Sequence, residues 1–229
     1  MRTGGETWPP GPIAINAKGG VGLGSITNRP SASVTADRAT AVTATASAEV
    51  VADGLGTRFL ADGAFDVVHA GASLLSCDAA EAGCLEARRR DPGAALDNNS
   101  WAMIPVDAAG LGLPSSSATI DIPAGASVAF AGLYWSGNTP VGADTATLGS
   151  ALLAAPGSAP VAIDAQQVEQ QGTRYLSFLD VTSTVASGGA GTWSFGGVAV
   201  VGGVGADAGW SLVVVLEDAA LAPTRVAVF

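Results

Sequence analysis

Residues 31–54, SASVTADRATAVTATASAEVVADG, alternate between apolar and polar side chains with a period of two. Alanines and valines fall on one side of this pattern, and hydroxyl or carboxylate side chains fall on the other. This alternation predicts a half-buried β-strand, because successive side chains of an extended backbone point to opposite faces. The segment can be one strand or two in succession, and because Arg38 interrupts the apolar side we expect a turn or bulge at 37–39.

The rest of the chain continues as short apolar segments between turns that contain glycine or proline. Strands are expected within 64–77, 98–110, 116–125, 126–135, 173–180, 191–203, 209–220 and 224–229, and a short helix is expected within 78–91. Residues 136–157 are expected to be mainly loops. The 31 glycines, and the many alanines and valines among the 48% of hydrophobic residues, suit short strands and tight turns.

These patterns predict an all-β fold, a β-sandwich or jelly-roll-like domain with a Gly/Pro-rich N-terminal arm. We expect residues 1–30 to form the arm and residues 31–229 to form one domain, since no internal repeat or long linker divides them. The chain ends in TRVAVF within an expected strand. That ending suggests a fragment, or a strand that pairs with a neighbour.

The net charge of −10 restricts the classes of partner. Nucleic-acid binding requires clustered cations, and the one dense basic cluster, Arg88 to Arg90, is interpreted as a solvated helix end paired with neighbouring carboxylates. No apolar run reaches the ~18 residues that span a bilayer, so no transmembrane segment is expected. MRTGGETWPP lacks an apolar signal-peptide core, which leaves the export route open.

The segment INAKGGVGLGS, residues 15–25, resembles the start of a nucleotide-binding loop. A phosphate loop needs a lysine directly before its Ser or Thr, with a helix behind it. Here Leu23 and Gly24 precede Ser25, and no helical pattern follows. We therefore interpret the segment as extended and Gly-rich, and we expect no cofactor.

Cys77 and Cys84 are the only cysteines, and His69 is the only histidine. A zinc site would need more ligands of these types. A local disulfide is the favoured interpretation, and it would place the protein in an oxidising compartment. Two buried free thiols are the alternative.

Catalytic and metal-binding patterns are weak. The chain has no G-x-S-x-G motif, and its carboxylates are scattered, so we expect no enzymatic activity. His69 is interpreted as a satisfied or edge residue of a strand. Asp97, Asn98, Asn99 and Asp107 are candidate calcium ligands, because oxygen-rich loops bind hard cations. Asn-rich turns also form without metal.

The five tryptophans bear on carbohydrate binding, which uses exposed aromatic rings. Trp101, Trp135, Trp193 and Trp210 lie in apolar strand patterns, and we expect them in the core. Trp8 lies in the Pro-rich arm, where it can act as an anchor.

Three stretches, FAGLYWSGNT (130–139), GTRYLSFLDVTSTVASGGAGTW (172–193) and AGWSLVVVLED (208–218), together resemble a known family. It is the N-terminal domain of large bacterial cell-surface proteins that bear extracellular repeat domains of unknown function. The family's cysteine pair, Asn run and Ser run match Cys77 and Cys84, Asn98-Asn99, and Ser115 to Ser117 in order. The resemblance covers residues 64–229 and implies a structural or adhesive surface protein without catalytic residues. Residues 1–63 lie outside the pattern, and the chain ends where the family continues into its repeats.

We therefore expect a non-enzymatic extracellular structural or adhesive protein of a bacterial surface. Self-assembly into a fibre is expected through strand addition by the arm, with Ile13, Ile15, Gly20, Gly22 and Gly24 as the docking segment. An arm folded back on its own domain is the competing interpretation. The alternative function is a carbohydrate- or calcium-binding module of a secreted protein, and the expected partners are copies of the chain or a cell-surface or glycan ligand.

Overall fold

The computed structural model describes residues 56–112 and 114–229, together with the backbone of four strands within residues 26–50. The chain divides into two compact units, one of residues 1–57 with Phe229 and one of residues 58–228. Each unit is described by itself. The predicted arm boundary at residue 30, Trp8, and the docking segment with Ile13, Ile15, Gly20, Gly22 and Gly24 lie outside the described residues.

The four strands of the first unit form two antiparallel pairs. β1 (Ile26–Asn28) pairs with β4 (Ala48–Val50), and β2 (Ser31–Val34) pairs with β3 (Val42–Thr45). The alternating segment 31–54 therefore contains three short strands, β2, β3 and β4, where its pattern predicts one strand or two in succession. The turn expected at 37–39 lies outside the described residues.

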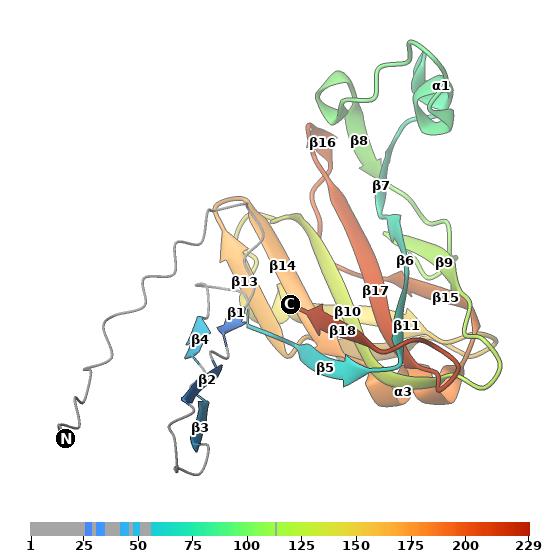
Figure 1. Cartoon of the computed structure of the whole chain (residues 1–229). Coiled ribbons are helices and arrows are strands. Elements are labelled where there is room, and N and C mark those ends of the chain that lie inside the picture. Colours follow the sequence, from blue (N-terminus) through green and yellow to red (C-terminus); the bar gives the residue numbers. More distant parts are fainter. Residues whose placement is uncertain (1–25, 29–30, 35–41, 46–47, 51–55, 113) are drawn as a thin grey trace, which may run out of the picture. The chain divides into compact units, whose positions relative to one another are not determined.

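The second unit is built on two antiparallel sheets (Figure 1). The five-stranded sheet has the order β13-β14-β10-β17-β6, and the four-stranded sheet has the order β12-β11-β15-β9. The first comprises β6 (Phe65–Ser73), β10 (Ser127–Asn138), β13 (Gln167–Gln171), β14 (Arg174–Asp180) and β17 (Ala208–Glu217). The second comprises β9 (Ser115–Ile120), β11 (Ser150–Ala154), β12 (Val161–Asp164) and β15 (Gly191–Gly196). The predicted all-β, sandwich-like fold is confirmed.

Large side chains from both sheets form one buried core. Trp135 and Trp210 belong to the five-stranded sheet, Trp193 and Phe195 belong to the four-stranded sheet, and all four side chains are at most 5% exposed. The ring of Phe195 lies 5.5 Å from the ring of Trp135 and 5.5 Å from that of Trp210. Such rings bury large apolar areas, so this cluster holds the two sheets face to face.

Each indole N–H in this core has an acceptor, as buried polar groups require. Trp135 donates to the carbonyl of Leu148 at 3.1 Å, Trp193 to the carbonyl of Gly189 at 3.2 Å, and Trp210 to the hydroxyl of Ser116 at 2.9 Å. Two short helices supply part of this framework. They are α2 (Thr145–Gly149) and α3 (Thr182–Gly188).

The outer face of the five-stranded sheet is partly covered by a separate strand pair. β5 (Phe59–Gly63) pairs with β18 (Thr224–Val228), and Phe59 and Val228 pack against Phe130, Phe178 and Val215 of the sheet. This second apolar cluster explains why β10, β14 and β17 carry large side chains on both faces. A sheet that is covered on both sides does not show strict alternation in its sequence.

Three segments differ from the expected elements. Residues 145–154 form α2 and β11 rather than loops, and β12 and β13 were not foreseen. Both are edge strands; β13, with the sequence QVEQQ, carries polar residues that weaken the apolar signal, and β12, with the sequence VAID, is only four residues long. In the other direction, the expected strand 191–203 ends at Gly196, because Gly197 adopts a left-handed conformation with φ of 71°.

Replacement of Trp210 by alanine should destabilise the second unit. The substitution leaves a cavity between the sheets and removes the hydrogen bond to Ser116, so we expect a loss of about 3–5 kcal/mol in the free energy of unfolding. Denaturant titration followed by circular dichroism measures it. Val141→Ala, at a fully exposed side chain, is the control, and a loss below ~1 kcal/mol for Trp210→Ala would show that the indole is not part of the core.

The two tyrosines predict the response of the fold to alkaline pH. Burial raises the pKa of Tyr175, whose hydroxyl donates to the carbonyl of Ala199 at 3.0 Å, and burial also raises the pKa of Tyr134. Because the folded-state pKa values exceed the usual ~10, the stability they contribute is present below that pH and is lost as pH rises above it. Ultraviolet titration should find less tyrosinate at pH ~10 in the folded protein than two free tyrosines would give. Two tyrosines that ionise at the ordinary pKa in the native protein would contradict this assignment.

Candidate binding site: the disulfide lobe and its groove

A small lobe extends from β6 and β17 of the five-stranded sheet (Figure 1). We call residues 75–105 with 203–204 the disulfide lobe. Its strands are β7 (Leu75–Cys77), β8 (Ala102–Pro105) and β16 (Gly203–Val204), in the sheet order β16-β8-β7. Its helices are α1 (Cys84–Arg89) and the short η1 (Asn98–Ser100). β7 follows β6 after one residue and β16 lies just before β17, so the sandwich sets the position of the lobe.

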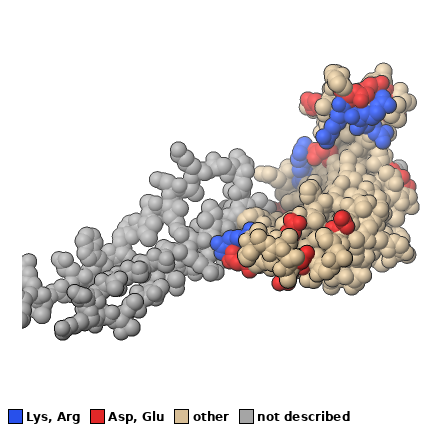
Figure 2. All heavy atoms as spheres, turned by 45° about the vertical axis from the view of Figure 1, so that its right-hand side comes forward, with Lys and Arg blue, Asp and Glu red and all other residues tan. Residues whose placement is uncertain are grey.

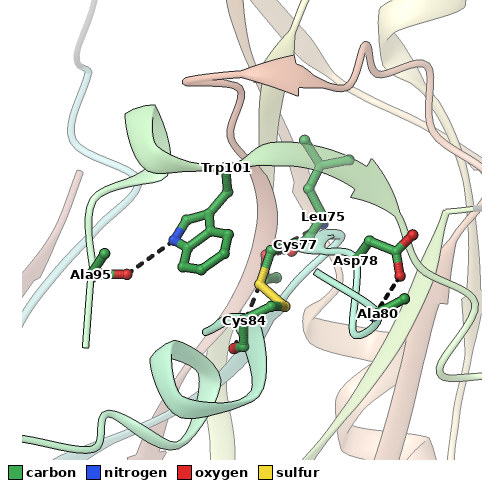
Figure 3. The surroundings of a disulfide bond; sticks show 8 residues. Leu75, Cys77, Asp78, Ala80, Cys84, Ala95 and Trp101 are labelled. Carbon is green, nitrogen blue, oxygen red and sulfur yellow. Dashed lines mark hydrogen bonds between the residues drawn. A yellow bond between two sulfur atoms is a disulfide. The ribbon is translucent and has the colours of Figure 1, made fainter. Parts of the chain in front are cut away.

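The predicted disulfide joins Cys77 on β7 to Cys84 at the start of α1, with a distance of 5.8 Å between the Cα atoms. Figure 3 shows the ring of Trp101 beside this bond. The indole is 8% exposed, packs with both cysteines and donates its N–H to the carbonyl of Ala95 at 2.9 Å. The disulfide and Trp101 form a small buried cluster of the lobe, and Leu75 of β7 is buried in the core of the sandwich.

Gly83 is required where the chain enters α1. Its φ is 88°, a left-handed conformation, and a Cβ atom there would lie 3.2 Å from the Trp101 ring. Glycine adopts this conformation without steric cost and lets the chain pass close to the indole. A larger residue at this position would displace Trp101 or α1.

Three consecutive arginines end α1 and form the blue patch on the lobe in Figure 2. Arg89 forms ion pairs with Glu86, at 3.9 Å, and with Asp91, at 3.3 Å. Arg90 caps the helix in a left-handed conformation with φ of 58°. Within the described part of the chain, Arg88 and Arg90 have no ion pair or hydrogen bond of their guanidinium groups. The interpretation of this cluster as a helix end paired with carboxylates therefore describes Arg89 and not its neighbours.

A groove of about 770 Å³ runs beside the lobe. Its two charged lining residues are Arg88 and Arg90, and the remaining lining is aliphatic or hydroxyl-bearing, apart from the edge of Trp101 and the amide of Asn98. The aliphatic part includes Leu75, Leu96 and Met103, and the hydroxyl groups belong to Ser73, Ser76, Ser116 and Ser117. A groove of this volume, with apolar and polar lining in similar amounts, has the dimensions of a ligand site.

Several large aliphatic side chains on the lobe remain in solvent. Leu96 is 61% exposed and Val204 is 71% exposed, and Leu85 and Ile104 are exposed as well. Leu96 is the one of these four that lines the groove, and single exposed aliphatic residues such as the others are ordinary on a protein surface. The lobe thus combines apolar contact area with two arginines that lack a partner in the described residues.

The candidate calcium residues lie in and near the lobe, each with its own hydrogen bonds. Asp97 caps η1 and accepts the backbone N–H of Asn99 at 3.0 Å. The amide of Asn98 donates to the carbonyl of Ala206 at 3.2 Å, and Asp107 accepts the hydroxyl of Ser115. The three-residue η1 holds Asn98 and Asn99 next to Asp97, whereas Asp107 lies in the loop before β9. No group of three or more His, Cys, Asp or Glu side chains that could hold a metal ion occurs among residues 56–112 and 114–229.

Other polar candidates have local structural contacts. His69 is exposed on β6, an edge strand, as expected. Asp144 begins α2, and hydrogen bonds from the hydroxyl and the backbone N–H of Thr147 lower the pKa of its carboxyl. Asp180 accepts the hydroxyl of Thr182 at the start of α3 in the same manner. Such carboxylates stabilise the first turn of a helix.

Comparison of the chain with protein-family models, curated proteins and solved structures finds no match. In the part of the chain that the structure describes, no helix is long and apolar enough to cross a membrane.

Loss of the disulfide should unfold the lobe before the sandwich. The bond closes a loop of about eight residues, which is worth about 2.5 kcal/mol of chain entropy. We expect thiol titration of the native protein without reductant to find no free sulfhydryl. The double variant Cys77→Ala/Cys84→Ala should expose Trp101, seen as a red shift in tryptophan fluorescence, while the circular dichroism of the sheets persists. Two reactive thiols in the native protein would contradict the bond.

Proposed function

We propose that the protein is a non-enzymatic structural or adhesive component of an extracellular surface, and that it acts by binding other polymers through its disulfide lobe. The observation that carries this proposal is the groove, with its two arginines and the exposed Leu96, beside a lobe that a disulfide closes and that continues from the strands of a two-sheet scaffold. Rigid scaffolds that present binding residues on the segments between strands are a common design for recognition.

Two further properties support an extracellular setting. Disulfides persist in oxidising compartments, and the Cys77–Cys84 bond contributes much of the small buried centre of the lobe. The resemblance of residues 64–229 to the N-terminal domain of bacterial cell-surface proteins points the same way.

The sheet edges support self-assembly as a second role. β6, β9, β12 and β13 stand at the ends of their sheets, and β6 lies alongside β9, so β12 and β13 are the outer edges that can serve as templates for strand addition. The proposed donor is the glycine-rich segment 13–25 of another copy of the chain. This segment has no carboxylate and one lysine, Lys18, so apolar and backbone contacts would dominate its docking.

Light scattering on purified protein tests self-assembly. The full chain should form particles that contain several copies, and a chain that lacks residues 1–30, and with them β1, should be monomeric and retain the circular dichroism of the second unit's sheets. Gly20→Val with Gly22→Val should also reduce the particle mass, because close backbone packing tolerates no side chain there. Equal mass for the full and the truncated chain would refute assembly through the arm.

A further inference from the structure

The edge of β9 next to the groove has a defined hydrogen-bonding pattern. Ser115 of β9 lies opposite Gly196 of β15. Next to this pair, the N–H of Gly197 donates to the carbonyl of Pro114 at 2.9 Å. In an antiparallel ladder, hydrogen-bonded pairs alternate with pairs that are not hydrogen-bonded. Ser115 and Ser117 therefore direct their backbone N–H and C=O groups away from β15.

The outward backbone groups of Ser115 already have hydrogen-bond partners, whereas those of Ser117 have none among the described residues. The N–H of Ser115 donates to the carbonyl of Val106 at 2.6 Å, and its carbonyl accepts the N–H of Ala108 at 2.9 Å. The chain then leaves the edge of β9. The backbone groups of Ser117 have no partner among the described residues, and Ser117 lines the groove. The groove thus contains the start of a ladder that one more strand could continue.

The charge of the groove selects an anionic ligand. Arg88 and Arg90 are its two charged lining residues, on a protein whose net charge is −10. Guanidinium groups bind carboxylates with charge-assisted and often paired hydrogen bonds. A positive site on an acidic protein also draws acidic groups toward it and repels cations.

The lining favours a polypeptide over a polysaccharide. Carbohydrate sites use exposed aromatic faces, but Trp101 is the one aromatic residue of the lining, and its ring is 8% exposed. Leu96 and the half-buried Met103 instead offer apolar surface for side chains of an extended chain. Free backbone groups on a strand edge match the alternating donors and acceptors of a peptide.

We infer that the groove binds an extended acidic peptide segment, which adds as a strand along Ser117 of β9 and places a carboxylate against Arg88 and Arg90. This inference rests on the proposed function and names the class of its partner. The arm segment 13–25 lacks acidic residues, so peptide binding in the groove and assembly through the arm are separate properties.

Calorimetric titration of the full chain with a synthetic peptide tests the inference. The probe is an acetylated and amidated peptide of about ten residues that alternates valine and threonine, with two central threonines replaced by glutamate; it spans roughly 33 Å when extended. We expect saturable binding with one peptide per chain. Glutamine in place of the glutamates should weaken binding about tenfold, the effect of losing a charge-assisted contact. N-methylation of the peptide backbone on the side that faces β9 should abolish it.

Two pairs of matched variants locate the peptide. Arg88→Glu with Arg90→Glu should weaken binding of the glutamate peptide at least tenfold, whereas Arg89→Glu, outside the groove on the same helix, should leave the affinity within about twofold. Ser117→Pro removes the free N–H at the groove and should abolish binding. Thr119→Pro removes the next outward-facing N–H, outside the groove lining, and controls for the effect of proline on an edge strand.

Several results would overturn the inference. The first is an absence of saturable binding up to about 1 mM peptide. The second is equal affinity of the N-methylated and the unmodified peptide. The third is a loss of peptide affinity in Arg89→Glu as large as that in Arg88→Glu with Arg90→Glu. Binding of an oligogalacturonate in place of the peptide would also overturn it, because the partner would then be an acidic glycan. Deletion of residues 1–30 separates the two proposals. Peptide affinity should survive this deletion even if the assembly proposal fails, and assembly can persist where the peptide does not bind.

Discussion

The packing of Trp135, Trp193, Trp210 and Phe195 between the two sheets is the interaction on which the remaining structure depends. These side chains are buried, and each indole N–H has an acceptor. The acceptor of Trp210 is the hydroxyl of Ser116 on β9, so the core also joins the five-stranded sheet to β9, the edge strand of the four-stranded sheet. Loss of this contact would move the edge that borders the groove.

The disulfide lobe illustrates how a small unit is kept folded. Its own buried cluster consists of the two half-cystines and Trp101, while Leu75 packs into the sandwich core, and this cluster alone is too little apolar surface to offset the entropy of ordering the lobe. The sandwich supplies the ends of β6 and β17, and the disulfide joins β7 to α1. Together they hold the lobe in one arrangement, so that Arg88 and Arg90 can face a preformed groove. Preorganisation of this kind lowers the entropy that binding must offset.

The sequence predicts local structure well where one physical cause dominates. The period of two in 31–54, the apolar run of β17 and the two cysteines each indicate what the structure contains. The sequence predicts local structure poorly where a contact with a distant part of the chain determines whether a strand forms or ends. β13, with the sequence QVEQQ, becomes a strand by pairing with β14, and Gly197 ends β15 through its backbone conformation. Arg88, Arg89 and Arg90 cannot be told apart in the sequence, since all three lie between Glu86 and Asp91. In the described residues, only Arg89 forms ion pairs with these carboxylates. The groove joins α1 to β6, β7, β8 and β9, which are separated by up to about 40 residues, and no local pattern marks it.

Hydrogen exchange of individual backbone amides on β9, followed by NMR, tests the central claim that a free strand edge borders the groove. The hydrogen-bonding pattern predicts slow exchange at Ser116 and Ala118, which bond to β15, and fast exchange at Ser117 in the protein alone. Addition of the glutamate peptide should slow exchange at Ser117, and the exchange at Thr119 should change little. Slow exchange at Ser117 without peptide would mean that another part of the chain already occupies this edge. Fast exchange that persists at saturating peptide would show that no strand is added, and either result would contradict the account.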